Sequence, residues 1–153
     1  MPTHEDRRIL PYTSEQLFDL VAGVDRYPEF LPWCLASRIT KRDGDVFYAD
    51  LVIGFKMVRE TFGSRVETER PNRIIVEPTR GPFRRMSNLW RFTDLPDGGC
   101  EVDFKVDFEF RSRLLNKLIG GLYHEAVRRM VGSFESRARA LYGPGIALPA
   151  PPA

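Results

Sequence analysis

The segment Cys100–Phe110 reads CEVDFKVDFEF and alternates between apolar and charged residues without interruption. Successive side chains of a β-strand point to opposite faces of a sheet, so this period of two predicts a strand with one apolar and one charged face. The side chains predicted to share the apolar face are those of Cys100, Val102, Phe104, Val106, Phe108 and Phe110. Such a strand needs a second layer that covers its apolar face.

The second layer is predicted by the next part of the sequence, where apolar residues recur at helical spacing. This spacing predicts one amphipathic helix from Ser112 to Tyr142, about 45 Å long at 1.5 Å per residue. One helix cannot cover a broad curved sheet completely, so we expect the functional site in the space left between the layers. The pair Gly120-Gly121 lies inside this helix and indicates either a bend or the close approach of another group.

The sequence before Cys100 predicts further strands joined by turn signals such as Asp43-Gly44. Thr13 and Gln16 have the spacing of a capping box and begin a short helix that ends at Gly23, and residues 25–32 form a second short helix or turn. The predicted fold class is α+β, with about seven antiparallel strands around the C-terminal helix. The strands predicted before Cys100 are Thr3–Leu10, Leu35–Lys41, Val46–Ile53, Met57–Val66, Arg73–Glu77 and Ser87–Thr93.

The chain has 153 residues, a formal net charge of +2 and two cysteines, Cys34 and Cys100. This length indicates one domain, and the weak positive charge does not indicate a DNA-binding protein. The cysteines form no CxxC pair, so we expect two buried, reduced thiols rather than a zinc site, a redox pair or a disulfide.

The two ends of the chain also carry information. Residues 1–8 lack the apolar core of a signal peptide, and no run of about 18 apolar residues is present, so we expect a soluble, cytoplasmic protein. We expect residues 1–143 to form the domain and the Ala/Pro-rich residues 144–153 to be a disordered tail.

No catalytic constellation is recognisable in the sequence, and we therefore expect no enzyme and no catalytic cofactor or metal. His4 and His124 are the only histidines, and each is interpreted as a solvated or flanking residue. The motifs HExxH, GxSxG and GxxxxGK[ST] are absent. The carboxylates of the Cys100 strand alternate outward and indicate a solvated face.

Aromatic residues gather on the predicted inner face and in two loops. Residues 27–33 place three aromatics in a proline-stiffened segment, and residues 80–85 place Phe83 between Gly-Pro and two arginines. An apolar tip flanked by cations is typical of a loop that touches a membrane, and it also occurs in ordinary surface loops. Both interpretations of the second loop stay open from the sequence.

The segment Val24–Cys34, VDRYPEFLPWC, resembles the signature of the coenzyme Q-binding, START-like family within the polyketide cyclase/dehydrase and lipid-transport superfamily. Single motifs are moderately specific, but their order and spacing agree over nearly all of residues 3–143. The further matching segments are VIGF at 52–55, GPF at 81–83, NLWRF at 88–92, VDF at 102–104, FEF at 108–110, and AVRRM at 126–130 with Phe134.

The resemblance implies a helix-grip fold with a hydrophobic tunnel that binds ubiquinone as its ligand and supports respiratory electron transport. Arg84 and Arg85 would hold the mouth of this tunnel at a headgroup or at the inner membrane surface, as a peripheral contact. The ligand-binding residues would be Phe30, Trp33, Phe55, Phe83, Trp90, Phe108, Leu118, Leu122 and Met130.

A second branch of the superfamily is equally similar in sequence. Its bacterial members are described as toxins that associate with the large ribosomal subunit and block subunit joining. Arginine pairs such as Arg128-Arg129 favour this ribosome-binding hypothesis, whereas the weak net charge favours a polyprenyl-quinone carrier. We favour the carrier, because burial of an isoprenoid tail yields about 25 cal/mol per Å² and needs no catalytic set. A cyclase acting in the same cavity remains a third hypothesis, supported by fold analogy alone.

Overall fold

The computed structural model describes residues 3–55, 58–120 and 123–145. Its seven-stranded antiparallel sheet has the order β1-β7-β6-β5-β4-β3-β2, which places the first strand beside the last. The helical elements are α1 (Ser14–Ala22), the 3₁₀ helix η1 (Val24–Glu29), α2 (Arg113–Gly120) and α3 (Tyr123–Tyr142). The strands are β1 (Thr3–Leu10), β2 (Cys34–Asp43), β3 (Val46–Phe55), β4 (Val58–Glu69), β5 (Arg73–Arg80), β6 (Phe83–Asp94) and β7 (Cys100–Phe110).

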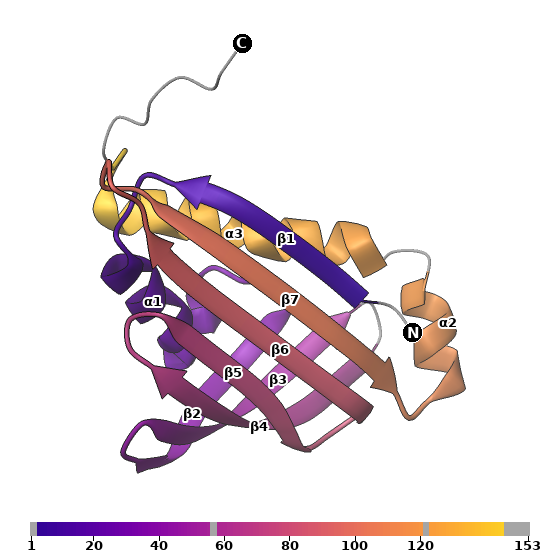
Figure 1. Ribbon diagram of the computed structural model, residues 1–153. Helices are drawn as coiled ribbons and strands as arrows, with labels where there is room; N and C mark the ends of the chain where they lie inside the picture. Colours follow the sequence, from indigo (N-terminus) through magenta and orange to yellow (C-terminus); the bar gives the residue numbers. More distant parts are fainter. Residues whose placement is uncertain (1–2, 56–57, 121–122, 146–153) are drawn as a thin grey trace.

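The predicted α+β helix-grip architecture is confirmed. Figure 1 shows the curved sheet with α3 running along one side of it, α1 near one end of the sheet and α2 at the opposite end. The bounds of β1 and β7 agree with the alternation in the sequence, and their residues pair in antiparallel register from Thr3–Asp107 to Leu10–Cys100. Pairing with β7 places β1 at one edge of this curved sheet, beside α3.

The region between β5 and β6 differs from the prediction. The loop expected at residues 80–85 is a tight turn at Gly81-Pro82, and Phe83 already belongs to β6. Gly81 has a φ of 132°, and a Cβ there would lie 2.9 Å from the carbonyl oxygen of Thr61. Glycine is therefore required for this turn to approach β4 so closely.

The prediction of one continuous helix from Ser112 to Tyr142 is wrong. The structure has two helices, α2 and α3, and Figure 1 shows that they are not collinear. Among the described residues, and apart from the adjacent residues and backbone of α2 itself, no atom lies within 4 Å of the position that a Cβ of Gly120 would take, which favours a bend over a close approach there. Gly121, the second glycine of the pair, lies outside the described residues.

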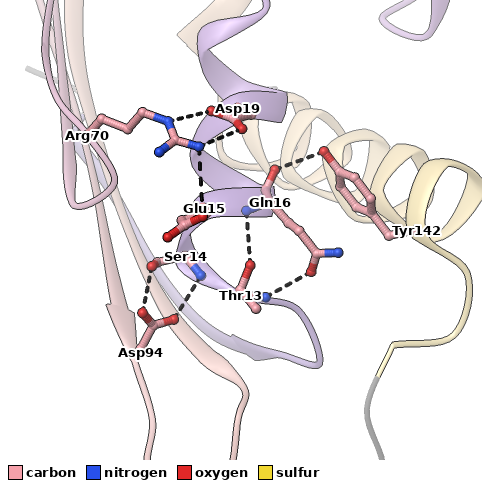
Figure 2. Close-up of polar contacts among 8 residues, drawn as sticks. All are labelled: Thr13, Ser14, Glu15, Gln16, Asp19, Arg70, Asp94 and Tyr142. Carbon is pink, nitrogen blue, oxygen red and sulfur yellow. Dashed lines mark hydrogen bonds and ion pairs between the residues drawn. The ribbon is translucent and has the colours of Figure 1, made fainter.

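Helix α1 begins with the predicted capping box. The Gln16 backbone N–H donates to Oγ1 of Thr13 at 3.1 Å, and the Thr13 N–H donates to Oε1 of Gln16 at 3.0 Å (Figure 2). Next to it, the N–H and hydroxyl of Ser14 both donate to the carboxylate of Asp94 at the end of β6. The start of α1 is therefore tied to the sheet by side chains as well as by apolar packing.

Two further contacts hold α1 from other sides (Figure 2). The guanidinium of Arg70 donates two hydrogen bonds of 3.0 Å to the carboxylate of Asp19. The hydroxyl of Tyr142 at the end of α3 donates to the carbonyl oxygen of Gln16 at 3.0 Å. The short helix thus joins the β4–β5 turn to α3 and closes one end of the space between sheet and helix.

In the part of the chain that is described, helices are too short or too polar to cross a bilayer.

Candidate functional site

The space between the sheet and α3 is filled at its centre by aromatic rings. The Trp90 ring on β6 lies 4.5 Å from that of Phe104 on β7 and 5.2 Å from that of Phe134 on α3, measured between centroids. Phe134 also packs edge-on against Tyr27 and Phe30, which come from the predicted proline-stiffened segment. Through Phe134, these aromatics join α3 to β6, to β7 and to the segment around η1.

Beside this cluster the structure encloses a cavity of about 20 Å³. This volume holds about one water molecule and cannot hold an isoprene unit. Its lining is apolar on most sides and polar at Asp6, Arg8 and Glu135. The apolar lining residues are Leu10, Leu17, Leu20, Val21, Trp90, Phe92, Val102, Phe104, Val131 and Phe134. The spacious tunnel implied by the resemblance is therefore not open at this position.

The inner face is less well covered between the Trp90 cluster and Phe110, which is itself buried. Trp90 and Phe104 are buried, whereas Met86, Val106 and Phe108, farther along the same two strands, are only half-buried although they pack against the core. Met130 of α3 is also half-buried. Solvent thus reaches apolar side chains of the inner face where α3 does not cover them.

Phe83 belongs to a second aromatic cluster beside this part of the inner face. Its ring centroid lies 5.1 Å from that of Phe62, 5.6 Å from that of Phe108 and 5.2 Å from that of Phe110. The prediction that Phe83 is an exposed loop tip is wrong, because β6 already begins at Phe83, within the segment expected to be a loop. Phe83 and Phe108 are nevertheless brought together, as the predicted ligand-binding set requires.

The other predicted ligand-binding residues fall in different places. Trp90 lies at the centre of the interior, and Phe30 and Trp33 are half-buried at the edge of the core. Leu118 lies on α2 and is 39% exposed. Phe55 is the last residue of β3, but its side chain and all of Leu122 lie outside the described residues.

Arg84 and Arg85, predicted to contact a membrane or headgroup, form ion pairs with β7. Arg84 lies 3.3 Å from Glu109, and Arg85 lies 3.3 Å from Asp107. These two ion pairs lie on the outer face of the sheet and are partly exposed to solvent. Ion pairs in such positions contribute little to stability. Each cation already has a carboxylate partner, which reduces its availability for an external anion.

A row of polar side chains on β1 is the part of the interior that the sequence analysis missed. His4, Asp6 and Arg8 alternate along the strand and face α3, with Nδ1 of His4 3.0 Å from Nδ1 of His124. Nη1 of Arg8 donates to Oε1 of Glu135 at 2.5 Å. The interpretation of His4 as a solvated residue is wrong, since it is only 8% exposed. The period of two in HEDRRIL was the signal for this row.

The thiols and the buried phenol show no activation for nucleophilic chemistry. Burial raises the pKa of Cys34 and of Cys100 to about 11, and it also raises the pKa of Tyr27, whose hydroxyl donates to the Val21 carbonyl. A catalytic thiol would need a lowered pKa. Across the described residues, no group of three or more His, Cys, Asp and Glu side chains could hold a metal ion.

Known proteins and one family model match this chain over most of its length. Residues 10–135 match the family model described as polyketide cyclase / dehydrase and lipid transport. The ribosome association toxin RatA of Pseudomonas aeruginosa is 34% identical over 94% of this chain and 100% of its own length. The coenzyme Q-binding protein COQ10 homolog B of Xenopus laevis, a mitochondrial protein, is 32% identical over 92% of this chain and 59% of its own length. The solution structure of the 18 kDa protein CC1736 from Caulobacter crescentus is 36% identical, with a TM-score of 0.74 over 94% of this chain and 99% of that one.

Proposed function

This chain belongs to the polyketide cyclase/dehydrase and lipid transport family, and from that membership we propose that it binds ubiquinone or a related polyprenyl lipid between the sheet and α3. In this role it is a carrier that presents the quinone to the respiratory chain. The observation that carries the proposal is the partly buried apolar inner face formed by Met86, Val106, Phe108 and Met130.

The chemistry of this face suits an isoprenoid. Such a tail offers only apolar surface, and its transfer from water is favourable by about 25 cal/mol per Å² buried. Phe83 and Phe108 would contact the tail at the less covered end, and Trp90 would limit how deeply it enters. The absence of activated nucleophiles among the described residues agrees with a binding role.

The cavity beside Trp90 is too small for an isoprenoid tail, so ligand binding requires side chains to move. Since about 20 Å³ is available beside Trp90, the tail must occupy space that side chains fill in the present conformation. Met86, Val106, Phe108 and Met130 are only partly buried, whereas Trp90 and Phe104 are buried, so we expect opening to begin at the partly buried residues. We therefore expect ligand binding to change the packing of α2 and of the first turns of α3.

Direct measurement of bound quinone tests the proposal. Purified protein is extracted with organic solvent and the extract analysed for ubiquinone by mass spectrometry. The delipidated protein is then titrated with ubiquinone while tryptophan fluorescence is followed, because Trp90 lies at the end of the proposed site. Protein that neither carries nor takes up ubiquinone would contradict the proposal.

A pair of variants on one strand makes the titration specific. Phe108→Ser removes an apolar side chain from the inner face, and we expect it to weaken ubiquinone binding by about tenfold. Lys105→Ser changes an exposed side chain of the same strand and should leave the affinity unchanged. Equal affinities of the two variants would place the ligand elsewhere.

Association with the large ribosomal subunit is the second candidate function. It is supported by relatives that carry the name of ribosome association toxin and align with more than nine-tenths of this chain. The test is sedimentation of the protein with separated ribosomal subunits at moderate salt. Co-sedimentation with the large subunit, together with no uptake of ubiquinone, would favour this function over the carrier.

A further inference from the structure

Helix α2 exposes two leucines to solvent. Leu114 is 66% exposed and Leu118 is 39% exposed. They are four residues apart and therefore about 40° apart around the helix axis, on one side of the helix. Large apolar side chains exposed next to each other on one short helix indicate a surface that is covered in the functional state.

The orientation of α2 is set by specific hydrogen bonds rather than by burial of its leucines. The Phe110 N–H donates to Oδ1 of Asn116 at 2.9 Å, and Nδ2 of Asn116 donates to the Phe110 carbonyl at 3.0 Å. The Leu115 N–H donates to the Ser112 hydroxyl oxygen at 3.3 Å. These contacts hold the Asn116 side against β7 and leave Leu114 and Leu118 pointing outward. In Figure 1, α2 lies at the periphery of the molecule, beyond the end of β7.

Cations lie directly beside the exposed leucines. Arg113 and Lys117 are exposed on the neighbouring side of α2, and residues 111–120 contain no Asp or Glu. Within the described residues, neither cation has a carboxylate at ion-pair distance, in contrast to Arg84 and Arg85 on the outer face of the sheet. The two charges of α2 are thus available to an external anion.

We propose that α2 docks the protein on an anionic lipid surface, with Leu114 and Leu118 inserted at the acyl boundary and Arg113 and Lys117 on the headgroup phosphates. An interfacial helix has this combination of exposed leucines and flanking cations. RNA would bind only the two cations of α2 and would leave Leu114 and Leu118 exposed to water. Because α2 is only about 12 Å long, it is too small to supply a stable protein–protein interface by itself.

Helix α2 lies next to the part of the inner face where we expect the lipid ligand to enter. Asn116 binds the backbone of Phe110, whose ring stacks on Phe83 in the less covered part of the inner face. A bilayer bound to α2 would therefore adjoin the end of the fold at which we expect the lipid ligand to enter. Arg113, Leu114 and Lys117 lie outside the predicted ligand-binding set, and only Leu118 belongs to both, so vesicle binding and ubiquinone binding are tested by separate measurements.

Vesicle co-sedimentation of the full chain tests the proposal. The wild type should sediment with phosphatidylcholine vesicles that contain phosphatidylglycerol, should bind pure phosphatidylcholine much less, and should be released as salt is raised. The variants Leu114→Ser/Leu118→Ser and Arg113→Gln/Lys117→Gln should each bind the anionic vesicles at least about tenfold more weakly. All four positions are exposed, so circular dichroism should show unchanged folding.

Matched controls come from α3 and from the sheet. Leu141→Ser/Arg139→Gln changes a leucine that is 50% exposed and an exposed arginine at the other end of the molecule, and it should bind as the wild type does. Arg84→Gln/Arg85→Gln should also retain binding, because these cations are already paired. The proposal is overturned if the wild type does not bind anionic vesicles or if the α2 variants bind them as well as the wild type. It is equally overturned if the α2 variants lose only ribosomal-subunit binding.

Discussion

Ser14 and Asp94 connect the first helix to the sheet through a polar contact between a buried serine and an exposed carboxylate. Ser14 has no exposed surface, and its N–H and hydroxyl donate to the two Asp94 carboxylate oxygens at 2.8 and 2.7 Å. Hydrogen bonds to a charged group are roughly twice as strong as neutral ones, and removal of the acceptor would leave two donors unsatisfied.

We predict that Asp94→Ala lowers the free energy of unfolding by about 2–3 kcal/mol, because both Ser14 donors lose their partner. Urea denaturation of the purified variant measures this change. Asp97→Ala, in the exposed turn that follows β6, is the matched control and should change the free energy by less than about 0.5 kcal/mol. Equal effects of the two substitutions would show that the Ser14 contact does not stabilise the fold.

The two cysteines lead to a prediction about pH. Burial raises the pKa of both thiols to about 11, so about 0.1% of each is thiolate at pH 8. We expect a disulfide reagent to label the native protein more than about 100-fold more slowly than the urea-unfolded protein. The raised pKa stabilises the fold below about pH 9, and this contribution is lost as the pH rises through 11. Rapid labelling of the native protein at pH 8 would contradict the buried positions.

At the scale of elements, β1 is joined to α3 by polar side chains rather than by an apolar seam. Arg8 bonds to Glu135 of α3 and also lies 3.2 Å from Asp6 of its own strand, and His4 lies against His124. Edge strands that carry charged residues facing inward are protected from pairing with other chains. The row therefore attaches the helix and shields the sheet edge at the same time.

A double-mutant cycle of Arg8→Ala and Glu135→Ala measures the strength of this attachment. Each side chain is about 30% exposed, so screening by solvent limits the expected coupling energy to about 1 kcal/mol. We expect the double variant to lose less stability than the sum of the single variants, as measured by urea denaturation. Additive losses would show that the pair does not interact in solution.

At the scale of the whole molecule, the two layers are held together by large side chains across a wide space. Figure 1 shows α3 running along one side of the sheet, and its residue Phe134 contacts Trp90, Tyr27 and Phe30. Aromatic rings fill the space between the sheet and α3 around Trp90, whereas Met86, Val106 and Phe108 of the same inner face are only partly buried. The Trp90 cluster therefore stabilises the fold, and the proposed ligand would bind the neighbouring, partly buried part of the inner face.

We predict that Phe134→Ala lowers the free energy of unfolding by about 3–5 kcal/mol, since it removes the central ring between α3 and the sheet. The measurement is urea denaturation supported by thermal unfolding. Leu141→Ala, on an exposed side of the same helix, should cost less than about 1 kcal/mol. A small effect at Phe134 would mean that the Trp90 cluster can close around the lost volume.

The sequence by itself determined the α+β class, the approximate positions of the seven strands and the short capped helix, because periods of two and 3.6 and turn signals are local properties of the chain. The helix-grip class was implied by the family resemblance. The alternation at Cys100–Phe110 predicted β7 residue by residue. Only the tertiary structure decided that Phe83 turns inward, that Arg84 and Arg85 pair with β7, and that His4 is buried against His124. It also decided the size of the cavity and the division of the C-terminal helix. These features depend on which distant residues meet and how their volumes fit, and no local pattern contains that information.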